Sequence, residues 1–344
     1  EYIDTGVYKA LCEHLPFEVI GATTVENMVA GEIDETMLTL LVLTSDEVSF
    51  ATAFSDAVTG EEEAPLRALY QSARQKLPGD PAMMLTFMPL LTTLGSDFYV
   101  DCMSAINGNV PNFGPVTVDH NADYHDSQVL LNGESWRDRI AILLMHGPVK
   151  PTFLIGSISE DRVFPEKGVV TASVGNQLQS VNGMSMIDFL QSIGLPKNEE
   201  GGITGINSFP IIVDYNDGTT PVARTMFALT PEGHAVCGGN IPVGSTLSIG
   251  SFDPEELIST TSAALEEVSR LETCGTVLMY SCIGRYFTQG YNQKAELQKV
   301  ADYLDNTKLT YMAAYSGGEL CPVYNKGGQT INRNHNNTFI VCAF

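Results

Sequence analysis

The sequence is poor in basic residues, with 18 Lys and Arg against 41 Asp and Glu in 344 residues, a formal net charge of −23. This deficit argues against a general nucleic-acid binder, because few side chains are available to displace counterions from phosphates. It also argues against docking on anionic lipid. Long apolar runs are missing too, and stretches such as 38–43 fall far short of the roughly 20 residues of a membrane helix. We therefore expect neither a nucleic acid nor a membrane as partner.

Cysteine pairs and familiar catalytic motifs are also lacking. The seven cysteines include no C-x-x-C pair, and most stand among apolar residues, as small buried hydrophobes do. A reducing cytoplasm is the simplest compartment that we expect. The sequence has no G-x-G-x-x-G, no P-loop and no G-x-S-x-G elbow, so nucleotide binding and serine hydrolysis have no signal. With 44% hydrophobic and 17% charged residues, the composition is that of a globular protein of about two domains.

A structural unit recurs along the chain. Near the C-terminus we predict a strand at 277–282, a helix at 295–304, a second strand at 309–315, a Gly-rich turn at 316–319 and a closing strand at 337–344. The same order is predicted earlier in the chain: a strand at 83–88, a helix at 97–106, a turn at 113–119 and a closing strand at 136–145.

A third and truncated copy is predicted at the beginning of the chain. It has a helix at 7–14, a strand at 17–20, a turn at 21–24 and a closing strand at 37–43. The first strand of this copy has no counterpart, because the sequence begins inside the unit. We therefore expect a strand of the native protein to precede Glu1.

The middle of the chain has a different pattern. Strands are predicted at 168–174, 177–181, 209–214, 223–230 and 245–249, with a short helix at 185–193. Asp253 and Pro254 are typical of a helix start and precede an apolar face over 254–271. This order suits an antiparallel sheet with helices to one side, as in sensory modules. We predict an α/β (α+β) fold of two domains, 1–150 and 151–344, with mixed sheets flanked by helices and built from β-α-β-turn-β units.

Few residues carry a chemical signal alone. The segment 119–126 holds two His and three Asp, but their spacing matches no metal signature, and we predict no metal site. Arg285 is suited to bind a ligand carboxylate bidentately or to pair with a structural acid such as Glu319, and the residues alone favour the structural pair. Asn27, Asp119 and Glu319 follow equivalent turns, so they either converge on one cleft between the halves or each cap their own turn.

Several motifs resemble those of FIST domain proteins. The stretches 281–285 (SCIGR), 315–322 (YSGGELCP) and 334–338 (NHNNT), with Ala295-Glu296, are similar to the C-terminal half of that family. The turn 20–24 (IGATT) resembles one in the N-terminal half, although Asn27 stands where the family has an acid. The resemblance implies a FIST N-terminal domain and a FIST C-terminal domain, acting as an intracellular sensory module for a small ligand such as an amino acid. It also implies an alternative, because a branch of the family binds haem and senses nitric oxide.

We therefore expect a ligand-binding sensor without catalysis or a required cofactor. In its site, Arg285 would meet a ligand carboxylate, Glu319 an amine, and the threonine hydroxyls the remaining polar atoms. The expected ligand-binding residues are Thr23, Thr24, Asn27, Asp119, Arg285, Glu319, His335 and Asn336. Besides haem, one alternative is an enzyme that uses an exposed thiol of Cys282 or Cys321 with a base within about 3 Å. Another is a scaffold whose acidic surface binds a basic partner. Since the sequence contains no kinase, cyclase or methyl-acceptor segment, we expect the output to pass through a signalling partner protein.

Overall fold

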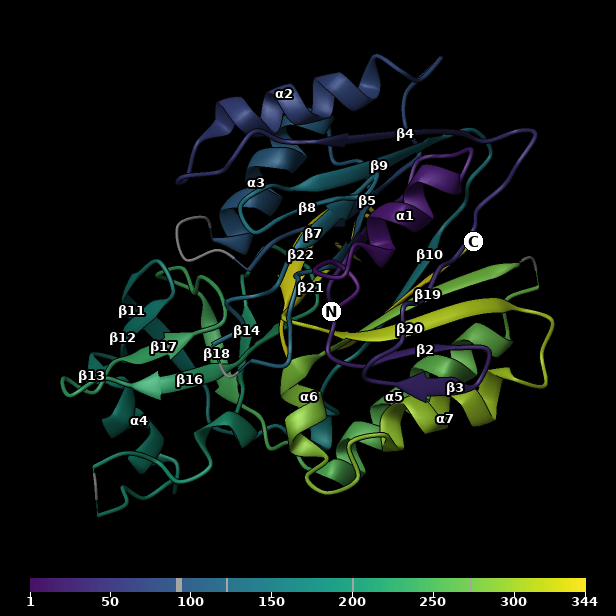
Figure 1. Cartoon of the computed structure of the whole chain (residues 1–344). Coiled ribbons are helices and arrows are strands. Elements are labelled where there is room, and N and C mark those ends of the chain that lie inside the picture. The colour runs from purple at the N-terminus through teal and green to yellow at the C-terminus, as the bar shows by residue number, and fades with distance from the viewer. Residues whose placement is uncertain (91–94, 122, 200, 273) are drawn as a thin grey trace.

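Two six-stranded sheets stacked face to face form the centre of the molecule (Figure 1). The computed structural model describes residues 1–344 apart from 91–94, 122, 200 and 273. The first sheet, here the β5 sheet, consists in spatial order of β22 (Thr330–His335), β21 (Glu319–Tyr324), β6 (Asn112–Pro115), β5 (Met83–Phe87), β9 (Ala141–His146) and β4 (Ser49–Phe54). The second, the β19 sheet, consists of β10 (Thr152–Gly156), β23 (Phe339–Ala343), β19 (Thr276–Cys282), β20 (Thr310–Ser316), β2 (Asn27–Val29) and β3 (Glu32–Asp34).

Helices cover the outer face of each sheet, which makes four layers. α2 (Glu63–Arg74) and α3 (Ser96–Asn107) pack on the β5 sheet, and α5 (Pro254–Ser269) and α7 (Ala295–Leu304) pack on the β19 sheet. The short α6 (Ile283–Thr288) follows β19 directly. Residues with alternating orientation along the strands fill both the helix–sheet cores and the core between the sheets. Among the described helices, none is long and apolar enough to cross a membrane.

The two sheets share one connectivity and exchange hairpins. In each, a parallel pair is linked through a helix, β5–α3–β6 and β19–α7–β20, and a closing strand runs antiparallel to the first strand of the pair. The hairpin β21–β22 from the C-terminal part of the chain extends the β5 sheet beside β6, whereas β2–β3 from the beginning extends the β19 sheet beside β20. Each sheet therefore contains strands from both ends of the sequence, and the predicted mixed α/β class is confirmed.

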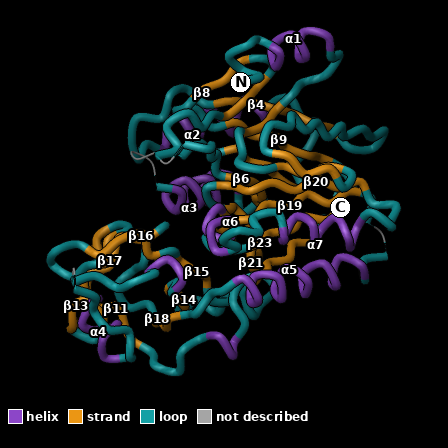
Figure 2. Tube along the Cα trace, turned by 60° about the horizontal axis from the view of Figure 1, so that its bottom comes forward, coloured by secondary structure: helices purple, strands orange, loops and turns teal. Residues whose placement is uncertain are grey.

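An antiparallel sheet, here the β14 sheet, lies to one side of the stacked sheets (Figure 2). Its main path has the order β15 (Val222–Arg224), β14 (Ile211–Asp214), β18 (Thr246–Ile249), β11 (Gly168–Val174), β12 (Gln177–Val181), β17 (Ala235–Cys237) and β16 (Met226–Leu229), and β13 (Met184–Ser185) pairs with β12. α4 (Met186–Ser192) packs on it, and short 3-10 turns occur at Glu160–Arg162 and Ile206–Ser208. The antiparallel middle section thus follows the prediction.

The beginning of the chain lies beside the β5 sheet. α1 (Val7–His14) precedes β1 (Ile20–Ala22), which pairs with the hairpin of β7 (Val129–Leu131) and β8 (Glu134–Trp136). Figure 2 shows α1 at the outer end of the molecule, beside β8 and outside the two stacked sheets. The N-terminal residues line one end of the space between the sheets.

Some predicted elements are wrong. Residues 37–43 form no strand, because the extended segment has no pairing partner among the described residues. The predicted strand 136–145 is divided between β8 and β9, and 223–230 is divided between β15 and β16 at opposite ends of the β14 sheet. The sequence patterns also missed β4, β7, β10 and α2.

Candidate functional site

A cavity of about 820 Å³ lies between the β5 sheet and the β19 sheet, under the N-terminal residues. Because side chains alternate along a strand, Tyr280 on β19 and Met312 and Ala314 on β20 point inward, opposite Leu85 and Leu143 of the other sheet. These residues make an apolar floor. The volume lies in the range of small-molecule sites, about 300–1,000 Å³.

The turn after β1 carries three of the predicted site residues to this cavity. The Thr23 amide donates to the Gln128 carbonyl at 2.9 Å, and the Gln128 amide donates to the Thr23 hydroxyl at 2.9 Å. These bonds prolong the pairing of β1 with β7. Glu26 lies three residues after Thr23, and its carbonyl accepts a bond from the Tyr315 amide at 3.1 Å. The turn therefore crosses from β7 to β20. Thr23 and Thr24 line the cavity on the way.

Strand register explains why Asn27 faces the cavity. Asn27 stands opposite Ala314 in the β2–β20 pair, and directly opposed residues point to the same face of a sheet. The side-chain amide of Asn27 donates to the Met37 carbonyl at 3.0 Å. The preceding Glu26 points to the helix side, where it is 1% exposed and lies 4.0 Å from Lys294. Burial raises the pKa of the Glu26 carboxyl.

Asp119 belongs to a polar end of the same cavity. One of its carboxylate oxygens accepts a bond from the Asn121 amide at 2.6 Å, which closes the local turn. Asn121 in turn donates to Asp126 at 3.0 Å, and Arg137 pairs with Asp126. Of the three residues that the sequence grouped, Asn27 and Asp119 line the same cavity and Glu319 does not, while Asp119 also caps its own turn. Ala122 lies outside the described residues, and no group of three metal-ligating side chains occurs in the described part of the chain.

The segment 37–43 forms one wall of the cavity. Its side chains alternate, with Leu38, Leu40 and Val42 exposed and Leu41 and Leu43 packed on the core between the sheets. Although this period is that of a strand, none of the described residues forms a backbone–backbone hydrogen bond with it. The wall is therefore held by its inward side chains and by the bond from Asn27.

Three polar atoms of residues in the cavity wall lack a hydrogen-bond partner among the described residues. They are the Tyr8 hydroxyl, the Thr39 hydroxyl and the second carboxylate oxygen of Asp119, and all three are buried. A buried polar group without a partner costs about 1–3 kcal/mol, so native proteins rarely keep one without a reason. The three residues line the same space, which makes this cavity the best candidate site in the described structure.

Comparison with known families identifies the chain. The FIST N domain matches residues 1–184, and the FIST C domain matches residues 189–322. The chain belongs to the FIST family. FIST domains are associated with sensory and signal-transduction roles. No curated protein matches the sequence. In this FIST protein, the cavity is built jointly, because four lining residues come from the FIST C match and the others from the FIST N match; the four are Leu278, Tyr280, Met312 and Ala314.

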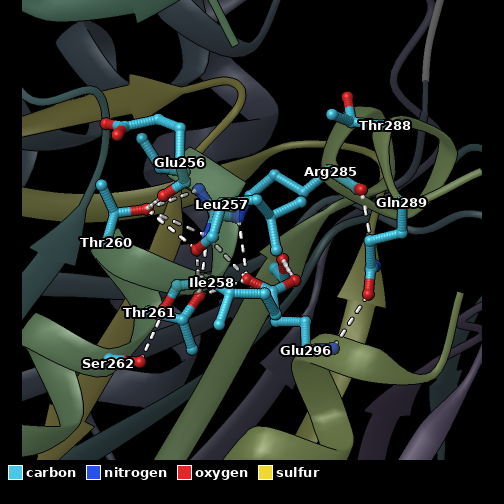
Figure 3. A network of polar contacts seen from close by, with 12 residues as sticks. Glu256, Leu257, Ile258, Thr260, Thr261, Ser262, Arg285, Thr288, Gln289 and Glu296 are labelled. Carbon is cyan, nitrogen blue, oxygen red and sulfur yellow. Dashed lines mark hydrogen bonds and ion pairs between the residues drawn. The ribbon is translucent and has the colours of Figure 1, made fainter. Parts of the chain in front are cut away.

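Arg285 lies outside the cavity, and its guanidinium is fully engaged elsewhere (Figure 3). α6 directs it under α5, where both Arg285 and Glu296 are 0% exposed and their charged groups are 2.6 Å apart. The same guanidinium donates to the Thr261 hydroxyl at 2.8 Å and the Leu257 carbonyl at 3.0 Å. Ser281 completes the network by donating to Glu296 at 2.6 Å. The structural ion pair foreseen for Arg285 therefore exists, with Glu296 and not Glu319 as partner, and the fully buried guanidinium lies out of reach of a ligand in the cavity.

Glu319 is likewise buried and away from the cavity. It is 0% exposed and accepts bonds from the Ser316 hydroxyl at 2.9 Å and the Thr338 hydroxyl at 2.8 Å. Burial raises the pKa of the Glu319 carboxyl to about 8, because desolvation disfavours the charged form. Glu319 joins the end of β20 to the start of β23, a role within the core.

His335 and Asn336 support the contact with the β14 sheet. The His335 ring lies 2.9 Å from the Cys321 carbonyl, and burial lowers the pKa of His335 to about 3. Asn336 packs so closely on Gly238 that a Cβ there would lie 2.4 Å from its side-chain oxygen. Nearby, the buried Arg224 of β15 pairs with Asp97 of α3 at 2.8 Å. Neither His335 nor Asn336 lines the cavity.

The thiol alternative conflicts with the structure. Cys282 and Cys321 are 3% and 0% exposed, and burial, with the nearby Glu319, raises the pKa of both thiols. A nucleophilic cysteine needs a lowered pKa and access for a substrate. These two residues therefore act as small core side chains.

Haem does not fit the cavity either. The one histidine that lines it, His120, is exposed at the rim. Haem carries two propionate groups, whereas the lining contains six carboxylate side chains and one guanidinium. Like charges at such a wall oppose binding.

Sequence reasoning missed several lining residues. Tyr280 and Met312 stand in strands that were predicted, and Gln128 stands beside β7, which was not, but no motif marks any of the three. The alternation of side chains along 276–282 and 310–316 shows which residues of each strand share a face. It does not show which of the two faces packs on a second sheet, because that depends on how the sheets stack.

Proposed function

We propose that this FIST protein is a sensory module that binds a small molecule in the cavity between its two large sheets. The observation that supports the proposal is the set of unpartnered polar atoms, on Tyr8, Thr39 and Asp119, in a cavity of about 820 Å³ with an apolar floor. A ligand with an apolar body and one polar group would satisfy them. Since none of the site residues forms a nucleophile–base pair, the proposal includes no catalysis. The ligand signal would pass to a partner protein.

The segment 37–43 suits the sensory role. It joins the β19 sheet, through β3, to the β5 sheet, through β4, and it forms part of the ligand wall. A ligand that contacts its inward side chains would order a segment that has no backbone pairing of its own. The exposed side chains Leu38, Leu40 and Val42 on its other face would then present a different surface to a partner.

A thermal-shift screen of small molecules with a cavity-filling variant tests the proposal. At a concentration of 100 times its Kd, a ligand stabilises the protein by about 2.7 kcal/mol. Thr24→Phe, which places a ring at the cavity wall, is expected to abolish the shift, whereas Thr59→Phe on the surface is expected to keep it. A ligand whose shift is equal in both variants would contradict this location, and so would a broad screen, amino acids included, in which no compound stabilises the wild type.

A further inference from the structure

The charges of the cavity wall are strongly unbalanced. Its lining contains the carboxylates of Glu1, Asp4, Glu18, Glu35, Asp119 and Asp126, against a single guanidinium, that of Arg137, and the His120 imidazole. Such a wall attracts cations and repels anions.

The few cations near the cavity are already engaged. Arg137 pairs with Asp126. Lys76, which lies outside the lining, is 3.6 Å from Glu18. Neither Glu35 nor Asp119 forms an ion pair with any described residue. Among the described residues, a ligand carboxylate or phosphate would therefore find no unpaired cation in the lining, whereas an ammonium group would find the carboxylates of Glu35 and Asp119, neither of which forms an ion pair.

Asp119 marks the place where such a group fits best. Its second carboxylate oxygen is buried without a hydrogen-bond partner among the described residues, and Thr39 of the 37–43 wall has an unpartnered hydroxyl. A protonated amine has several N–H donors and no acceptor, so it matches the unpartnered carboxylate oxygen of Asp119. The apolar floor around Leu143, Tyr280 and Met312 takes a hydrocarbon body.

From these observations, and resting on the proposed function, we infer that the ligand is an amphipathic organic cation: an amine with a hydrocarbon body and without a carboxylate or phosphate group. The ammonium group lies at Asp119, with Glu35 at the rim. The hydrocarbon body lies between the sheets. This class differs from the amino acids that the family resemblance suggests, because their carboxylate has no cation to meet once Arg285 is paired with Glu296.

Three probes with the same tail and different head charges test the inference: n-octylamine, 1-octanol and n-octanoate. We expect titration calorimetry on the full chain at pH 7 to show that octylamine binds at least about tenfold tighter than octanol, and octanoate weaker than octanol. Asp119→Asn, which keeps the oxygen that accepts from Asn121, is expected to remove this tenfold preference and leave the affinity for octanol unchanged. Glu35→Gln is expected to act in the same direction. The matched control Asp161→Asn, at an exposed position outside the lining, is expected to change neither.

The outcomes distinguish a failure of the cation inference from a failure of the proposed function of the cavity. If octanol or octanoate binds as tightly as octylamine, and Thr24→Phe abolishes that binding, the cation inference is overturned while the cavity keeps its proposed function. If octylamine binds equally well to Thr24→Phe, it binds the acidic surface, and the inference is overturned. None of the three probes binds in a third outcome, while another compound stabilises the wild type but not Thr24→Phe. In that case the inferred ligand class is wrong and the proposed site is right.

Discussion

The carboxyl group of Glu319 makes the stability of the fold depend on pH in an unusual direction. Its pKa is about 8 in the folded chain, against an ordinary value of 4.5. Between these values the folded state holds a proton that the unfolded state releases, so the stabilisation is complete below pH 4.5 and is lost as the pH rises to 8. At about 1.4 kcal/mol for each pH unit, the loss across this window amounts to roughly 4 kcal/mol.

Glu319→Gln isolates this contribution, because glutamine has the shape of the neutral carboxyl and does not ionise. Denaturant unfolding of the wild type and the variant is measured between pH 5 and 8.5. We expect the two to be within about 1 kcal/mol at pH 5 and the variant to be the more stable by about 4 kcal/mol at pH 8.5. Glu134→Gln, on the exposed end of β8, is the control and should follow the wild type. If the free energies of unfolding of the wild type and Glu319→Gln changed equally with pH, Glu319 would not be the group responsible for the pH dependence.

Three further predictions concern residues placed by the structure. The pKa of buried His335 is about 3, so its contribution to the free energy of unfolding is lost as the pH falls from 6.5 towards 3. His335→Gln should therefore make the free energy of unfolding less dependent on pH in this acid range. An unchanged pH dependence would contradict this. Arg285→Met should destabilise the fold by about 3–5 kcal/mol because it leaves Glu296 buried and unpaired. Ligand affinity, measured by calorimetry, should change less than about twofold. A large loss of affinity would indicate that Arg285 contributes to the binding site. Amides of 38–43 should exchange with solvent at least about 1,000-fold faster than those of 278–280, and ligand should slow them; strong protection without ligand would show that the segment is paired.

Much of the fold was predictable because its signals are local. Asp253 accepts from the Glu256 amide as an N-cap, and Pro254 begins α5 as predicted. α7 and α1 have the predicted bounds, since apolar residues with helical spacing end where polar turns begin. By contrast, the alternation over 37–43 correctly indicates an extended segment, but pairing depends on a neighbour that the segment itself does not specify.

The candidate site was predicted only in its N-terminal half. Thr23, Thr24, Asn27 and Asp119 follow strands that end between the two sheets, and the turn pattern carries that information. Arg285, Glu319, His335 and Asn336 were grouped by motif, but a motif does not show whether a polar residue is exposed or satisfied. Glu296 is 11 residues from Arg285 along the chain and meets it only because α6 and α7 pack under α5.

A crystal structure of the full chain with 8-bromooctylamine would show where the ligand lies, because the anomalous signal of bromine locates the end of the hydrocarbon tail. We expect one bromine peak between the sheets, near Leu143 and Tyr280, with the amine at Asp119 and residues 37–43 closed over it. A peak on the outer face of either sheet, or on the β14 sheet, would contradict it.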